Sequence, residues 1–132
     1  MDRATILVVD DDEDNRTLVA RILRRHEFYV VTAVGGHEAL EKIHEGQVDL
    51  VLLDVMMPGM DGYEVYHRLK ESDNTRNIPI IMLTALSMAE QVEKALHIAP
   101  SWYIAKPFDA KYLLKRVRQA LFSSRNPRPL SQ

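Results

Sequence analysis

The stretch ILVVDDDEDN, residues 6–15, decides the fold of this chain. Its four apolar residues are mostly β-branched, as is typical of a strand that is buried on both faces. Five acidic residues follow at once, so the carboxyl end of the strand opens onto side chains that repel one another. Clustered carboxylates either share protons or hold a cation, because like charges a few ångströms apart cannot all stay ionised without compensation. The stretch therefore favours a buried strand that ends in a cation site.

Short apolar runs of this kind recur along the chain and alternate with amphipathic stretches. The strands that they predict are Ile6–Val9, Tyr29–Ala33, Leu50–Leu53, Ile80–Leu83 and Trp102–Ala105. Helical periodicity follows each of them, over Leu18–Leu23, Ala39–Ile43, Val65–Leu69, Val92–Leu96 and Leu113–Leu121. This alternation predicts five βα units, which form an α/β fold with a parallel sheet covered by helices on both faces.

Local signals predict where some elements begin and end. Ser87 followed by Glu90 is a capping-box pattern, which would open the fourth helix, and Pro100 biases Ala99 away from helix and so helps to end it. Residues 123–132, SSRNPRPLSQ, lack apolar periodicity. We therefore expect one domain over residues 1–122, followed by a flexible tail or the start of a linker over 123–132.

The composition excludes several classes of protein. At 132 residues with 46% apolar and 27% charged residues, the chain fits one globular domain. A net charge of −2 gives no basic excess for direct nucleic-acid binding, and the lack of cysteine excludes disulfides and thiolate metal sites. No apolar run approaches the ~20 residues of a membrane span, and the N-terminus does not resemble a signal peptide. We expect a cytoplasmic protein that does not bind membranes.

Residues at the carboxyl ends of the strands deserve the closest reading, because ligands of open parallel sheets bind there. The residues that the sequence places at these ends are Asp10, Asp11, Asp54, Thr84, Ala85 and Lys106. A hard divalent cation suits the carboxylates, and Mg²⁺, with Mn²⁺ as a substitute, is the expected cofactor. A lysine and a threonine suit the remaining oxygens of a phosphoryl group, as a point charge and as a donor.

Plainer interpretations exist for the individual acids. An aspartate after a strand is often a helix cap, so Asp12 or Asp14 would be the N-cap of the first helix. Asp61 with Gly62 is typical of a turn. Asp54 is harder to explain in this way, because it ends an apolar strand, where an ionised side chain is costly without partners. The functional signal is the convergence of all these residues at one edge of the sheet.

Four segments in this order resemble the receiver domain of the two-component response regulators. They are ILVVDDDEDNR, DLVLLDVMMPGMDGYEV, IPIIMLTA and YIAKPF, and together they span nearly the whole chain. The resemblance implies a flavodoxin-like, doubly wound (βα)5 three-layer sandwich with strand order 2-1-3-4-5. It also implies that Asp54 is the phosphoacceptor, and that Asp10 and Asp11 bind Mg²⁺ with Asp54 and the main-chain carbonyl of Met56.

The same resemblance assigns roles on the far side of the site. Thr84 and Lys106 would contact the phosphoryl group, Tyr103 matches the aromatic switch residue of the family, and the Lys106–Pro107 bond would be cis. The donor would be a sensor histidine kinase or a phosphotransfer protein. The output face would be the fourth helix, fifth strand and fifth helix, which would act on a partner or an attached effector domain that the sequence does not identify.

Two apolar residues bear on how long such a signal lasts. Met56 and Leu86 lie two residues after Asp54 and Thr84, and neither can orient an attacking water by hydrogen bonding. We therefore expect slow self-dephosphorylation, while small Ala85 leaves room for the phosphoryl group. Because the domain would complete the site of its own modification and turn over no separate substrate, we do not expect an enzyme.

The segment HIAPSWY, residues 97–103, departs from the family pattern, which usually has small and acidic residues there. The departure argues against the charge-paired dimer that many DNA-binding regulators form through this face. Trp102 would be either a buried residue or, if exposed, a partner anchor. Lys111, Lys115, Arg116 and Arg118 would form a solvated basic side of the last helix.

Two other classes of protein compete with this interpretation. A phosphatase of the haloacid dehalogenase type also uses an aspartate at a strand end, but it needs a second aspartate where this chain has Met56. A dinucleotide-binding domain needs a GxGxxG loop, and the five glycines of the chain do not build one.

Overall fold

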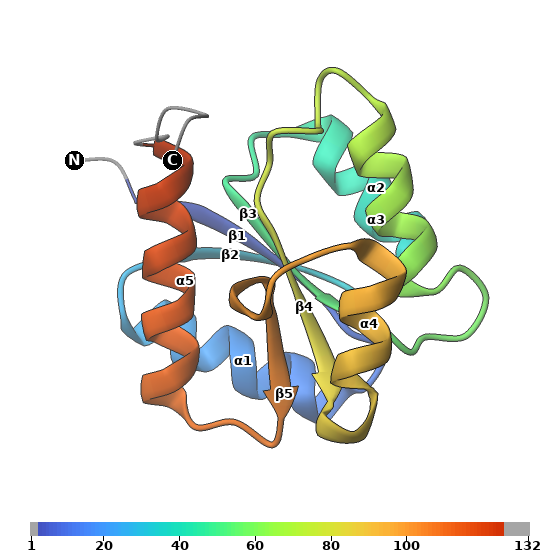
Figure 1. Ribbon diagram of the computed structural model, residues 1–132. Coiled ribbons are helices and arrows are strands. Elements are labelled where there is room, and N and C mark those ends of the chain that lie inside the picture. Colours follow the sequence, from blue (N-terminus) through green and yellow to red (C-terminus); the bar gives the residue numbers. More distant parts are fainter. Residues whose placement is uncertain (1–2, 126–132) are drawn as a thin grey trace.

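The computed structural model describes residues 3–125, in which strands and helices alternate (Figure 1). The strands are β1 (Thr5–Val9), β2 (Tyr29–Ala33), β3 (Leu50–Asp54), β4 (Ile80–Ala85) and β5 (Tyr103–Lys106). The helices are α1 (Glu13–Arg25), α2 (Gly36–Glu45), α3 (Gly62–Glu71), α4 (Ala89–Leu96) and α5 (Ala110–Arg125). Two short 3-10 turns, η1 (Leu86–Met88) and η2 (Pro100–Trp102), flank α4.

The strands form one parallel sheet in the order β2-β1-β3-β4-β5, which confirms the predicted fold and strand order. Val9 lies opposite Leu53, and Asp54 lies opposite Leu83, so β1, β3 and β4 end at nearly the same level. The register therefore brings the residues after these strands to one edge of the sheet.

Helices cover both faces of the sheet because alternate residues of each strand point to opposite sides. On one face Leu7, Val51 and Leu53 pack with residues of α2, α3 and α4. On the other face Ile6 and Leu52 join the core formed with α1 and α5. Figure 1 shows this division, with α2 and α3 on one side of the sheet and α1 and α5 on the other. The central strands are apolar on both faces for this reason.

The outer strand β2 is protected along its open edge by two cations. The Asp10 amide donates to Ala33 O at 3.1 Å, and because carbonyls alternate along a strand, those of Val30 and Thr32 point away from β1. Arg24 of α1 donates to Val30 O at 3.3 Å, and Lys42 of α2 donates to Thr32 O at 2.5 Å. Both helices next to β2 thus satisfy its outward carbonyls.

The capping signal for α4 was wrong, whereas Ala99 before Pro100 is extended, as predicted, although the helix already ends three residues earlier. Ser87 does not cap α4, because β4 continues into η1 over residues 86–88 and the helix begins at Ala89 without a side-chain cap. The helix ends at Leu96, where His97 adopts a left-handed conformation (φ 55°) and closes the last turn, and Pro100 begins η2 instead. Trp102 belongs to η2, so β5 starts one residue later than predicted.

The end of the chain also differs from the prediction. Helix α5 continues to Arg125, so the residues expected to begin a flexible tail at Ser123 are helical. The rest of that predicted tail, residues 126–132, lies outside the described residues. Among residues 3–125, none of the helices combines the length and the apolar character needed to cross a membrane.

Candidate functional site

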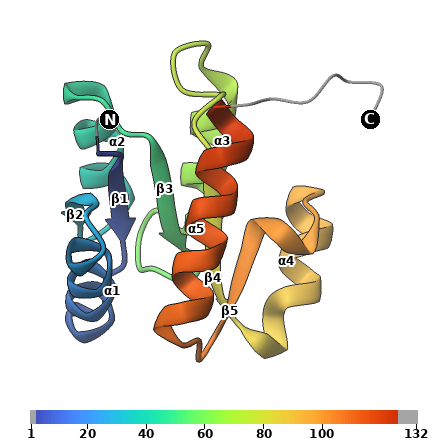
Figure 2. The same cartoon turned by 90° about the vertical axis from the view of Figure 1, so that its left-hand side faces the viewer.

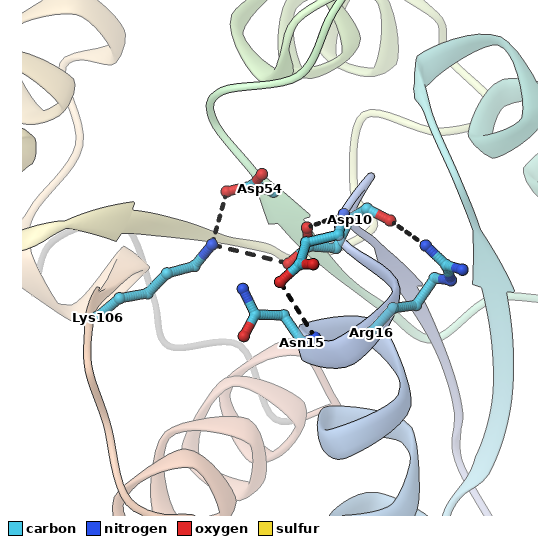
Figure 3. Close-up of polar contacts among 6 residues, drawn as sticks. Asp10, Asn15, Arg16, Asp54 and Lys106 are labelled. Carbon is cyan, nitrogen blue, oxygen red and sulfur yellow. Dashed lines mark hydrogen bonds and ion pairs between the residues drawn. The ribbon is translucent and has the colours of Figure 1, made fainter.

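Asp10 directly follows β1 and is held by the start of α1 (Figure 3). One of its carboxylate oxygens accepts a hydrogen bond from the Asp12 amide at 2.9 Å, while Arg16 donates to its main-chain carbonyl at 2.8 Å. Asp12 is the N-cap of α1 and accepts from the Asn15 amide at 3.4 Å, which confirms the capping interpretation for this acid. The acids of this run therefore have different roles: Asp12 caps α1, and the carboxylate of Asp10 belongs to the acidic cluster.

Asp54 is positioned by the close approach of α3 to the end of β3. A Cβ atom on Gly62 would lie 2.4 Å from the carbonyl oxygen of Asp54, so only glycine fits there. The Gly62 amide donates to Val55 O at 2.9 Å. Asp61 does more than the predicted turn, because it is the N-cap of α3 and accepts from the Glu64 amide at 3.0 Å. These contacts fix the loop after β3 and with it the Asp54 backbone.

Lys106, at the end of β5, connects the two strands that carry these acids. Its ammonium nitrogen lies 2.9 Å from Asp54 Oδ1 and 3.7 Å from Asp10 Oδ2 (Figure 3). Burial disfavours the ammonium, but the hydrogen bond and the charge of Asp54 outweigh this effect and raise the pKa of Lys106. The Lys106–Pro107 bond is cis, as predicted.

The carboxylates of Asp10, Asp11 and Asp54 each offer an oxygen within 4.8 Å of the others. The side chain of Asp11 is exposed, whereas Asp10 and Asp54 are only 1% and 6% exposed. Burial is the largest cause that raises the pKa of both buried acids, and it is opposed by the Asp12 amide at Asp10 and by Lys106 at Asp54. The single ammonium therefore does not fully compensate three carboxylates, and their oxygens fit a hard divalent cation.

Thr84, Met56 and Leu86 lie beside the acidic cluster in the segments at the ends of β3 and β4. Thr84 is buried, and its hydroxyl donates to the carbonyl of Ala85 at 3.3 Å. The side chains of Met56 and Leu86 are 62% and 70% exposed. Two apolar side chains thus face solvent in the segments that follow β3 and its neighbour β4.

Tyr103 and Trp102 take different positions. Tyr103 is half-buried against the core on the sheet face that α2, α3 and α4 cover. Its hydroxyl donates to Glu93 of α4 at 3.1 Å. Burial first, and then the Glu93 carboxylate, raise the pKa of Tyr103. Trp102 is half-buried against the core on the opposite face, which α1 and α5 cover. Arg116, predicted to be solvated, is half-buried and donates to the carbonyl of Ser101.

Sequence reasoning missed three residues of this arrangement. Arg16 has the pattern of an ordinary helix cation, and Glu93 that of an exposed helix acid, so no local signal marked either one. Gly62 carried a signal, because a glycine directly after a capping aspartate often marks a close backbone approach. Each of them contacts a residue that the sequence did predict for the site: Arg16 contacts Asp10, Gly62 contacts Asp54, and Glu93 contacts Tyr103.

Comparisons with known proteins agree with the geometry of this site. A sequence model of the response regulator receiver domain matches residues 6–118. The chain is 42% identical over 115 residues to the response regulator PleD of Caulobacter vibrioides and 36% identical over 116 residues to the phosphate regulon transcriptional regulatory protein PhoB of Escherichia coli. These matches cover 87% and 88% of this chain, but only 25% and 51% of the two relatives.

A solved structure gives a match over nearly its whole length. The chemotaxis protein CheY4 of Vibrio cholerae superimposes with a TM-score of 0.82 at 30% identity. The match covers 90% of this chain and 99% of that one. PleD and PhoB therefore contain further sequence beyond the matched part, whereas the CheY4 structure consists of this fold alone.

Proposed function

The chain belongs to the response regulator receiver family, and from this premise we propose that it is a phosphorylation-dependent switch in which Asp54 accepts the phosphoryl group. The observation that carries the proposal is the placement of Asp54. Its buried carboxylate ends a central strand, within hydrogen-bond distance of Lys106 and close to two further acids. A buried structural aspartate would need a cation such as Lys106, but two further carboxylates beside it would only add repulsion.

The donor in this proposal is a phosphohistidine on a sensor histidine kinase or a phosphotransfer protein. An oxygen of the Asp54 carboxylate attacks phosphorus, the P–N bond breaks with its electron pair on the imidazole, and an acyl phosphate remains on Asp54. Catalysis of phosphoryl transfer is mostly positioning and charge stabilisation. The chain contributes a fixed nucleophile and, in Lys106, a cation that stays charged because its pKa is raised.

A divalent cation is part of the proposed site. Asp10, Asp11 and Asp54, with the main-chain carbonyl of Met56, would hold Mg²⁺ or its substitute Mn²⁺, because oxygen ligands and excess negative charge are what these ions need. When bound, the ion would neutralise charge on the phosphoryl oxygens. The Asp12 amide and Arg16 keep Asp10 in place for this purpose through its side chain and its carbonyl.

Lys106 and Thr84 would respond to the new group. A phosphoryl group brings about two negative charges and three acceptor oxygens. Lys106 already contacts the accepting carboxylate. The Thr84 hydroxyl would exchange its weak bond to Ala85 O for a phosphoryl oxygen, since a charged acceptor makes the stronger bond.

The readout would pass from Thr84 to Tyr103. Tyr103 pairs in the sheet with Met82, two residues before Thr84, and holds Glu93 of α4 through its hydroxyl. Movement of Thr84 would change the balance between this bonded position and another, and so alter the α4-β5-α5 face. An output partner or an attached effector domain then shifts the population by its differential affinity for the two states.

In this proposal the output activity belongs to the partner or the attached effector domain, not to the receiver domain. The domain itself turns over no separate substrate, and its net charge of −2 does not favour direct contact with nucleic acid. Its own dephosphorylation would be slow, because the exposed side chains of Met56 and Leu86 cannot hold an attacking water.

Intact mass spectrometry tests the proposal. The chain is incubated with acetyl phosphate and Mg²⁺, and the same is done with Asp54→Asn and with EDTA in place of the metal. One base-labile phosphoryl group should appear on the wild type and be absent in both controls. If the Asp54→Asn variant also gained a phosphoryl group, another residue would be the acceptor. If the wild type gained none with several donors, the proposal would be overturned.

A further inference from the structure

A cavity of about 830 Å³ lies at the end of the sheet opposite to Asp54. Figure 1 shows α3 and α5 both ending at this edge, where the strands begin. Tyr66 and Lys70 of α3, Ile80 at the start of β4, and Trp102 of η2 line it, together with Ser123 and Ser124 from the last turn of α5. In Figure 2 the end of α5, in red, and the orange segment after α4 both lie toward the part of the sheet formed by β4 and β5, away from β2.

The size and the apolar part of the lining fit a small organic molecule. Cavities that bind such molecules measure roughly 300–1,000 Å³ and combine apolar walls with a few polar groups. Here Tyr66 and Trp102 supply aromatic surface, and Pro79, Ile80 and Ile98 supply aliphatic surface. Apolar walls alone do not choose a ligand, so the charges of the lining decide its chemistry.

Two cations and a histidine belong to the lining of the cavity. Lys70, Arg76 and His97 line it, and no carboxylate does so among the residues that the structure describes. Arg76 already pairs with Asp73, which lies outside the lining. Lys70 differs: its ammonium lies 5.5 Å from the centre of the Tyr66 ring and donates to the carbonyl of Arg76 at 3.2 Å.

Lys70 makes no ion pair with any carboxylate of residues 3–125. Burial is the cause that lowers its pKa. By surface area Lys70 is an exposed residue, and an ammonium without a counter-ion attracts an anion that comes within a few ångströms of it. The cavity therefore combines aromatic walls with a cation that has no anionic partner within residues 3–125.

We propose that this cavity binds a small amphipathic anion, in which one carboxylate, sulfonate or phosphate group pairs with Lys70 and a ring or short apolar body packs against Tyr66 and Trp102. The site is separate from the strand-end acids, since none of its lining residues belongs to that cluster. It does not depend on phosphorylation, so Asp54→Asn should bind the same ligand with the same affinity.

Fluorescence titration with 8-anilinonaphthalene-1-sulfonate tests the charge and the apolar part together. The matched neutral probe is N-phenyl-1-naphthylamine, which has the same ring system without the sulfonate. Lys70→Gln should weaken binding of the sulfonate about tenfold, as expected for loss of one bond to a charged group, and leave the neutral probe unchanged. The control Lys115→Gln removes an exposed lysine of α5 outside the cavity and should change neither.

Two measurements keep the result tied to this cavity. Lys70→Arg retains the charge and should keep the sulfonate affinity within about threefold, which separates loss of charge from loss of folding. Amide chemical shifts should move at Asn77 and Ile98, which line the cavity. Shifts centred on Arg118 and Gln119, which line a neighbouring cavity of about 560 Å³, or equal affinity of Lys70→Gln and wild type, would overturn the proposal.

Discussion

Lys106 reaches across β4 to place its ammonium 2.9 Å from the carboxylate of Asp54. The two residues are 52 positions apart in the chain and lie on strands that are not neighbours in the sheet. A cation at this distance from the proposed acceptor can offset the charge that builds up when a phosphoryl group arrives. The first prediction follows from this pair.

Replacing Lys106 by methionine, which is similar in length but uncharged, should slow phosphorylation of Asp54 by about a hundredfold, as for other lost charge-stabilising groups. The rate is measured by intact mass over time with acetyl phosphate and Mg²⁺. Lys115→Met is the matched control on the exposed side of α5 and should react like wild type. If Lys106→Met reacted at the wild-type rate, the lysine would have only a structural role.

The buried carboxylate of Asp10 should destabilise the protein when no metal is present. Burial raises its pKa, so the folded chain holds this proton to a higher pH than the unfolded chain, and ionisation at neutral pH opposes folding. Asp10→Asn should raise the midpoint of thermal unfolding at pH 7 in EDTA. This gain should shrink as the pH falls through the raised pKa toward the ordinary value of 3.8. The exposed Asp14→Asn should show no such gain.

Addition of Mg²⁺ should make the wild type unfold at a higher temperature than Asp10→Asn, the reverse of the order in EDTA. An ion that binds only the folded chain stabilises it by about 2.7 kcal/mol at a hundredfold excess over Kd, and the wild type should gain several degrees in the midpoint. Asp10→Asn should gain much less, because it lacks one of the three carboxylates. Equal shifts in both proteins would remove Asp10 from the metal site.

Exposed apolar side chains beside the site should prolong the phosphorylated state. The double substitution Met56→Asn and Leu86→Glu supplies groups that can hold an attacking water, so the phosphoryl group should be lost about tenfold faster. Loss is followed by intact mass after removal of the donor. Tyr29→Asn, at a residue with a similar exposed fraction of 57% at the far end of the sheet, should leave the lifetime unchanged. An unchanged or longer lifetime in the double variant would contradict the prediction.

Gly62 is expected to tolerate no side chain. A methyl group there would lie 2.4 Å from Asp54 O and 2.8 Å from Val55 Cα, so the loop after β3 must shift. Gly62→Ala should lower the free energy of unfolding by about 1–3 kcal/mol, measured in urea, and should also slow phosphorylation. At Gly46 a methyl group meets nothing within 4 Å, so Gly46→Ala is the control. Equal stability of both variants would show that the close approach is not needed.

The fold was predictable because the central strands are continuous apolar runs over most of their length. Leu50 to Leu53 are buried on both faces of the sheet, so their pattern could not arise on a surface. The site followed from the fold, because parallel strands bring their carboxyl ends to one edge. Asp10, Asp11, Asp54 and Lys106 do lie together as expected.

Features that depend on tertiary packing were not predictable. The capping pattern at Ser87 was overridden because β4 continues into a 3-10 turn before α4 can begin. The burial of Arg116 follows from its contact with Ser101, 15 residues away, and no local pattern reports such a contact. The bond between Tyr103 and Glu93 likewise depends on how α4 lies against β5.

The two cations on the outward carbonyls of β2 bear on the solubility of the protein at high concentration. An edge strand with free carbonyls is a template on which a strand from another molecule can add, and growth from such edges leads to fibrils. Arg24 and Lys42 occupy these acceptors and place positive charge along the same line. The outermost strand can therefore keep its apolar β-branched sequence without recruiting further copies of the chain into a continuous intermolecular sheet.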